Sequence, residues 1–158
     1  MCVRWKVLVA SSVAAVSLVG CQPTTPGSQI GYEHFRFTCC VNSDLQKAWH
    51  PGEEMALHWI AASAGMTSDA TGVPIELSAV LSGPYASVAT LKAGGSHARA
   101  LAASPIAVTD RTPGDPVSGI VLPLDLPAGW YNLTFTIRSA GGNLVESATV
   151  VQVTLVSP

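Results

Sequence analysis

The chain has 158 residues, enough for one domain and too few for two ordinary ones. Charged residues make up only 11% of it, against the roughly 25% that is usual in soluble domains, and hydrophobic residues make up 48%. The net charge of −2 and the lack of any basic run argue against nucleic-acid binding, and the apolar content argues against a wholly disordered chain.

The first twenty residues have the pattern of an export signal. Arg4 and Lys6 form a short positive start, and the following segment 7–20, VLVASSVAAVSLVG, carries no charge. This run is shorter than the roughly 20 apolar residues that a spanning helix needs. A positive start, a short apolar core and small residues at the end are typical of a secretory signal. Removing the segment leaves six basic and ten acidic residues, a net charge of −4.

The end of this segment, Leu18-Val19-Gly20-Cys21, resembles the lipobox of bacterial lipoproteins. The resemblance implies cleavage between Gly20 and Cys21 and attachment of a diacylglyceryl group to the Cys21 thiol. One acyl chain binds a membrane only marginally, and two chains on one residue satisfy the need for two anchoring signals. The resemblance therefore implies a lipid-anchored protein of the cell envelope, on the extracytoplasmic side of a membrane.

A polar segment, QPTTPGSQ at residues 22–29, follows Cys21. It contains two prolines and a glycine and has no apolar side chain to bury, so a flexible or semi-extended linker is expected. We expect three parts: a cleaved signal at residues 1–20, the lipidated cysteine with its tether at 21–31, and a folded domain at 32–158.

Alternation of apolar and polar residues dominates the folded part and predicts half-buried strands. Segments with this pattern are residues 35–41, 55–59 and 73–81, with weaker candidates at 85–91 and 98–108. A turn is expected at Trp49 to Gly52, and Ser82-Gly83-Pro84 is expected to break the chain. The alanine-rich stretch 86–103 is also compatible with one helical turn.

The second half continues in the same way. A loop is expected at residues 111–116, strands at 117–122, 131–138 and 144–156, and a hairpin turn at 140–143. The side chains predicted to face inward are Tyr131, Leu133, Phe135, Ile137, Val151, Val153 and Leu155. Seven or eight short strands separated by turns predict an all-β fold, a sandwich or barrel.

The stretch from Leu122 to Val153 resembles the closing hairpin of immunoglobulin-like bacterial surface domains. The matching positions are Pro127, Gly129, Tyr131, Leu133 and the Gly141-Gly142 turn. The resemblance implies an immunoglobulin-like β-sandwich in which Tyr131 takes the corner role known from such sandwiches. It implies no activity, because the motif carries no catalytic residue.

Cys39 and Cys40 remain after Cys2 leaves with the signal and Cys21 takes lipid. On a strand their side chains point to opposite faces, so Cys39 is expected to be buried and Cys40 exposed. Three states stay open for the pair: two free thiols, a vicinal disulfide, or a pair of soft-metal ligands. Export into an oxidising compartment would favour the disulfide among these states.

A copper or redox accessory protein is the alternative function that this pair suggests. Cys39, Cys40, Met55 and His58 lie near one another in sequence, and soft ligands suit Cu(I). Met55 and His58 are expected on opposite faces of their strand, however. His34, His50, His58 and His97 have no familiar metal spacing, so solvated surface histidines are expected, and no cofactor is predicted.

We found no nucleophile elbow, no pair of catalytic carboxylates and no zinc-protease helix in the sequence, so no enzyme is predicted. Asp110, Asp115 and Asp125 are expected to cap turns. Trp59 is expected in the core, and Trp49 and Trp130 flank turns, where they could pack or form an exposed platform for a glycan or protein. The predicted function is a membrane-anchored, non-catalytic binding or envelope-structural module.

Overall fold

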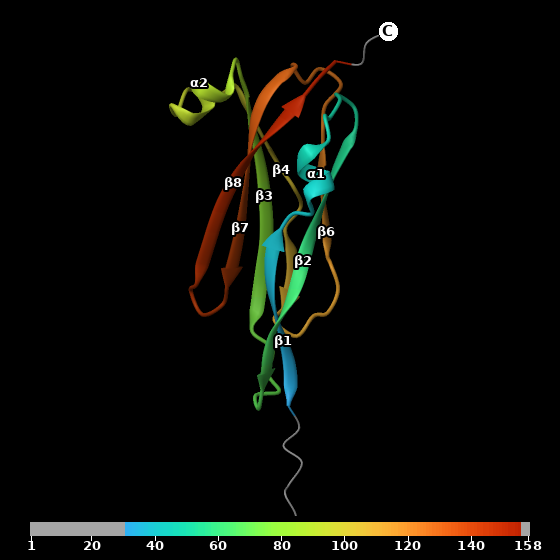
Figure 1. The fold of residues 1–158 in the computed structure, drawn as a ribbon, viewed down its shortest axis with the longest axis vertical. Coiled ribbons are helices and arrows are strands. Elements are labelled where there is room, and N and C mark those ends of the chain that lie inside the picture. Colours follow the sequence, from blue (N-terminus) through green and yellow to red (C-terminus); the bar gives the residue numbers. More distant parts are fainter. Residues whose placement is uncertain (1–30, 156–158) are drawn as a thin grey trace, which may run out of the picture.

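The structure, a computed structural model, describes residues 31–155 (Figure 1). The predicted signal, the lipobox cysteine and most of the linker lie outside these residues. Eight strands and two five-residue helices make up the described part. In chain order they are β1 (Tyr32–Cys39), α1 (Asn42–Gln46), β2 (Glu54–Thr67), β3 (Pro74–Tyr85), α2 (Val88–Lys92), β4 (Arg99–Ala102), β5 (Ile106–Thr109), β6 (Val117–Val121), β7 (Gly129–Ser139) and β8 (Leu144–Val153).

The strands form two antiparallel sheets, and the all-β sandwich predicted from the sequence is confirmed. One sheet has the order β1-β2-β6, and the other has the order β4-β3-β7-β8 with β5 also paired to β3. This arrangement corresponds to strands A-B-E and C′-C-F-G of an immunoglobulin-like sandwich. β4 and β5 pair with the two ends of β3 and act as one interrupted edge strand.

The core lies between the sheets and is built by the alternation seen in the sequence. Met55, Leu57 and Trp59 of β2 are fully buried, and so are Leu77 and Leu81 of β3. The Trp59 ring meets the ring of Phe135 edge to face, with centroids 6.3 Å apart. The inward residues of the closing hairpin that are buried as predicted are Tyr131, Leu133, Val151 and Val153.

Tyr131 ties the start of β7 to the loop before it. Its hydroxyl donates a hydrogen bond of 2.7 Å to the carbonyl of Pro127, four residues upstream. This is the bond expected of a corner tyrosine. The ring also packs against β3 at Gly83, where an added Cβ would lie only 2.5–2.9 Å from three of its atoms. Burial raises the pKa of Tyr131.

Several sequence-based boundaries are wrong. β3 does not break at Ser82-Gly83-Pro84, because a register irregularity between Ser82 and Tyr85 accommodates the proline, as bulges do. Residues 85–91 are not a strand: α2 begins after Ser87, whose hydroxyl accepts the Thr90 N–H. The single helical turn considered for 86–103 is therefore present.

Two further differences lie at edges. The expected strand 98–108 is divided into β4 and β5 by Ser104-Pro105, where the proline has no N–H to donate. Leu155 was expected to face inward but is 67% exposed, because β8 ends at Val153 and the chain leaves the sheet. α1 was not predicted at all.

The strand directions give the sandwich two distinct ends (Figure 1). The start of β1, the β2–β3 connection and the β7–β8 turn lie in the lower part of the view, and we call this the tether end. α1, α2, the β6–β7 connection and the end of β8 lie in the upper part, which we call the far end. In residues 31–155 neither short helix is long and apolar enough to cross a membrane.

Candidate functional site

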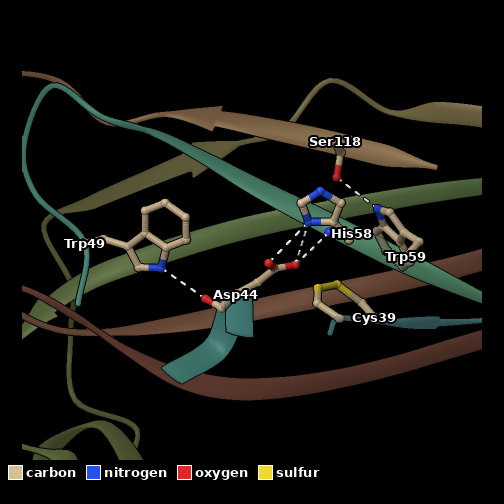
Figure 2. Close-up of a disulfide and its surroundings, with 7 residues drawn as sticks. Cys39, Asp44, Trp49, His58, Trp59 and Ser118 are labelled. Carbon is tan, nitrogen blue, oxygen red and sulfur yellow. Dashed lines mark hydrogen bonds and ion pairs between the residues drawn. A yellow bond between two sulfur atoms is a disulfide. The ribbon is translucent and has the colours of Figure 1, made fainter. Parts of the chain in front are cut away.

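The neighbouring cysteines lie where β1 leaves its sheet. Cys39 is the last residue of β1 and pairs with Trp59 of β2, and Cys40 follows it directly. The structure joins the two by a disulfide, and the peptide bond between them is cis. Figure 2 shows the disulfide below the Asp44 carboxylate, close to Trp59.

The predicted exposure of the two cysteines is wrong. Cys40 is buried, with 7% of its surface exposed, and Cys39 is only half-buried. The strand rule of opposite faces does not extend to Cys40, because β1 ends at Cys39 and the chain turns into α1. Cys40 joins the hydrophobic core, and Cys39 packs against it.

Asp44 takes over from β1 as the hydrogen-bond partner of β2. Helix α1 places its carboxylate 2.8 Å from the His58 backbone nitrogen, which donates to it, and 3.1 Å from His58 Nδ1. Nearby, the Val41 N–H donates to the His58 carbonyl at 3.2 Å. A buried carboxylate needs such partners to offset its desolvation. Asp44, 8% exposed, is thus fully engaged in the fold.

His58 is the solvent-facing half of this pair. Its Nδ1 faces Asp44, and 45% of its side chain is exposed. Its Nε2 has no hydrogen-bond partner among residues 31–155. The Asp44–His58 pair and the disulfide therefore form one cluster, open to solvent through the imidazole and through the half-buried Cys39 (Figure 2).

Trp49 belongs to the core and lies on the side of Asp44 away from the disulfide (Figure 2). Its Nε1 donates to the Asp44 backbone carbonyl at 3.2 Å, and its backbone bonds to Gln152 and Thr154 fix the segment to the end of β8. Only 4% of Trp49 is exposed. Trp49 therefore cannot form part of an exposed aromatic platform with Trp130. Lys47 covers its ring at 4.1 Å.

Ser118 does not complete a catalytic triad with Asp44 and His58. It pairs with Leu57, whose side chain faces the core, and its hydroxyl accepts the Trp59 Nε1 hydrogen at 2.9 Å. His58 pairs with Val117 on the outer face of the same sheet. Although the two side chains overlap in Figure 2, the sheet separates them, so the imidazole cannot take the Ser118 proton.

Met55 lies away from the cluster, as the strand alternation indicated. It is fully buried in the core, whereas His58 is on the outer face of β2. The set Cys39, Cys40, Met55 and His58 is therefore not brought together as one ligand group. In residues 31–155 no cluster of three or more His, Cys, Asp or Glu side chains is placed to hold a metal ion.

The loop aspartates were expected to cap turns, but the bonds of their side chains reach residues far away in the sequence. Asp110 accepts the Val73 N–H at 2.8 Å, and Asp115 accepts the Ala61 N–H at 3.0 Å. Asp125 forms a two-pronged pair with Arg99, with distances of 2.6 and 3.0 Å, and this pair lowers the pKa of Asp125.

Sequence reasoning missed Asp44. Its helix is too short to show any apolar periodicity, and the only signal was the polar run Asn42-Ser43-Asp44 directly after the two cysteines.

Comparisons with known proteins place the chain in no family. No protein family and no curated protein matches it. Among solved structures, the sporulation control protein Spo0M from Bacillus subtilis matches with 16% sequence identity and a TM-score of 0.36. The match covers 76% of this chain and 49% of that one, so this chain spans about half the length of that protein.

Proposed function

We propose that this chain is a lipid-anchored extracytoplasmic protein whose immunoglobulin-like domain serves as a binding or structural module of the cell envelope. The observation that carries the proposal is the N-terminal sequence, in which an uncharged run ends in Leu18-Val19-Gly20-Cys21. β1 begins at Tyr32, so ten residues, 22–31, separate the proposed lipidated cysteine from the first strand.

The disulfide supports a location outside the cytoplasm. Disulfides form and persist in oxidising compartments and are rare where thiol reductants are abundant. A disulfide between Cys39 and Cys40 therefore agrees with export of the chain.

The sandwich suits a binding or structural role because its two sheets present loops at both ends on a rigid scaffold. At the far end lie Leu124, which is 87% exposed, and the Arg99–Asp125 ion pair. In protein contacts a polar rim surrounds an apolar centre, and these residues would supply one of each.

The intact mass of the protein extracted from bacterial membranes tests the anchor. We expect a chain that begins at Cys21 and carries a diacylglyceryl group, and a Cys21→Ser variant that stays uncleaved and unlipidated. Cys2→Ser is the matched control and should be processed normally, because Cys2 lies in the removed segment. Unchanged maturation and membrane partitioning of the Cys21→Ser protein would refute the proposal.

A redox or soft-metal role at Cys39 and Cys40 is the second candidate. The observation that favours it is the Asp44–His58 pair beside the disulfide, which supplies an imidazole with a solvent-facing nitrogen. An external dithiol would supply the two electrons and two protons that convert the disulfide to two thiols and would itself become a disulfide. The two thiols alone would suit a soft metal such as Cu(I).

Thiol titration and Cu(I) binding separate the two candidates. After mild reduction by a dithiol, the second candidate predicts two reactive thiols and one Cu(I) per chain. It also predicts that copper binding is lost in Cys40→Ser. Two thiols that appear only after unfolding, with no stoichiometric copper, would exclude it.

A further inference from the structure

The β7–β8 hairpin carries an uncharged, apolar tip at the tether end of the sandwich. Residues 139–145, SAGGNLV, contain no charged side chain. Leu144 is 54% exposed and Val145 is 58% exposed. Both lie at the start of β8, an edge strand whose first five residues are exposed; as neighbours on a strand, the two side chains point to opposite faces of the sheet. Exposed apolar side chains of this size on a projecting turn indicate a contact surface.

A shallow apolar depression adjoins this tip. It has a volume of about 230 Å³. The backbone joins it to the hairpin, because the Ala140 N–H donates to the Pro74 carbonyl at 2.9 Å. Val73, just before β3, is 41% exposed. The depression is lined by Pro74, Ile75, Glu76, Ala107, Val108, Arg138 and Ala140. We call Val73, Leu144, Val145 and this depression the apolar foot.

The length of the tether decides which end of the domain can reach the bilayer. Eleven Cα–Cα steps separate Cys21 from Tyr32, which span at most about 40 Å at full extension. β2, with 14 residues, is about 45 Å long at roughly 3.3 Å per residue. The tether is therefore too short to run back along the sandwich, and the far end cannot rest on the membrane that holds Cys21.

We infer that the apolar foot rests on the interface of the lipid bilayer that anchors the chain. The inference depends on the lipid anchor proposed above. The foot holds one cation, Arg138, which pairs in register with Glu76 of β3, so attraction to anionic lipid is not the driving force. The partner is instead the apolar interior just below the headgroups, which exposed Leu and Val side chains enter as they do in interfacial proteins.

Tryptophan quenching by brominated lipids tests the contact. The mature lipidated protein is reconstituted into phosphatidylcholine vesicles, with or without bromine on the acyl chains. Leu144→Trp places a reporter in the foot. Leu124→Trp places a control reporter at the far end, where the native side chain is even more exposed, 87% against 54%. Unchanged thermal unfolding of both variants shows that the fold is intact.

The unsubstituted protein gives the quenching of the native Trp49, Trp59 and Trp130. After this background is subtracted, we expect the Leu144→Trp protein to lose at least about twice as much fluorescence to brominated lipid as the Leu124→Trp protein. Adding Val145→Ser to Leu144→Trp should reduce this difference. Equal quenching of the two reporters in protein that floats with the vesicles would overturn the inference and leave the anchor intact. Protein that lacks acyl mass and does not float would overturn both.

Discussion

The clearest test of the site concerns Asp44, whose carboxylate replaces β1 as partner of the β2 backbone. Asp44→Ala leaves the His58 N–H, now bonded at 2.8 Å, without an acceptor. A buried unsatisfied donor costs about 1–3 kcal/mol. The contact with the imidazole adds less than about 1 kcal/mol, because 45% of the His58 side chain is exposed to solvent.

We therefore expect Asp44→Ala to lower the free energy of unfolding by about 2–3 kcal/mol and the melting temperature by about 6–12 °C. Asp44→Asn keeps an oxygen that can accept the N–H and should cost about half as much. His58→Gln keeps the backbone bond and removes only the ring contact, so its cost should stay below about 1 kcal/mol.

Urea and thermal unfolding of the mature protein in mild detergent, followed by the combined fluorescence of Trp49, Trp59 and Trp130, measure these differences. The decisive comparison is between the two positions. If Asp44→Ala destabilised the protein no more than His58→Gln, the carboxylate would not be acting through the β2 backbone, and the reasoning would be refuted.

Three further outcomes follow from the packing and charges. Tyr131→Phe removes the hydroxyl bond of the tyrosine corner and should cost about 1 kcal/mol in urea unfolding. Gly83→Ala should lower the free energy of unfolding by about 1–3 kcal/mol in the same assay, because its Cβ would meet the buried Tyr131 ring. The control Gly119→Ala would meet only the flexible side chain of Glu54 and should lower it far less. Asp125→Asn removes the exposed pair with Arg99. Because the folded pKa of Asp125 is lowered, any stability that the pair gives is present at neutral pH and is lost as the pH falls through that pKa. The melting temperatures of wild type and variant should therefore converge at acid pH.

Alternation predicted the part of the fold that buries side chains. Met55, Leu57 and Trp59 were expected on one face of a strand, and each is fully buried. The same pattern found β7 and its inward Tyr131, because period-2 apolar residues report which face of a sheet meets the core. These features depend only on neighbouring residues, so the sequence alone was enough.

Positions where a tertiary contact overrides the local pattern were not predictable in the same way. Pro84 was expected to end a strand, yet β3 passes through it with an irregular register and resumes at Tyr85. Ser87 did carry a local signal, since serine is a favoured helix N-cap, but the alanines after it gave no clear period. Local propensity competes here with sheet pairing that joins residues far apart in sequence.

The candidate site was only half visible in the sequence. The sequence indicated Cys39, Cys40 and His58 as candidates, because thiols and imidazoles are reactive groups and metal ligands. Their neighbour Asp44 was not indicated, because its helix is too short to show an apolar period. The backbone bond from His58 to Asp44 spans 14 residues and exists only because β1 stops one pair short of His58. A break in a ladder depends on two strands together, so neither strand alone predicts it.

The proposed anchor makes the two ends of the sandwich unequal. A tether of at most about 40 Å holds the tether end near the bilayer, while a body about 45 Å long carries the far end away from it. Leu144 and Leu124 are both exposed apolar side chains, but on this geometry only Leu144 has lipid within reach. Leu124 lies on the β6–β7 connection at the far end and, with the proposed anchor, would face the aqueous side. A soluble or envelope partner would therefore meet the far end first, on the side where α1 contributes Asp44 to its pair with His58.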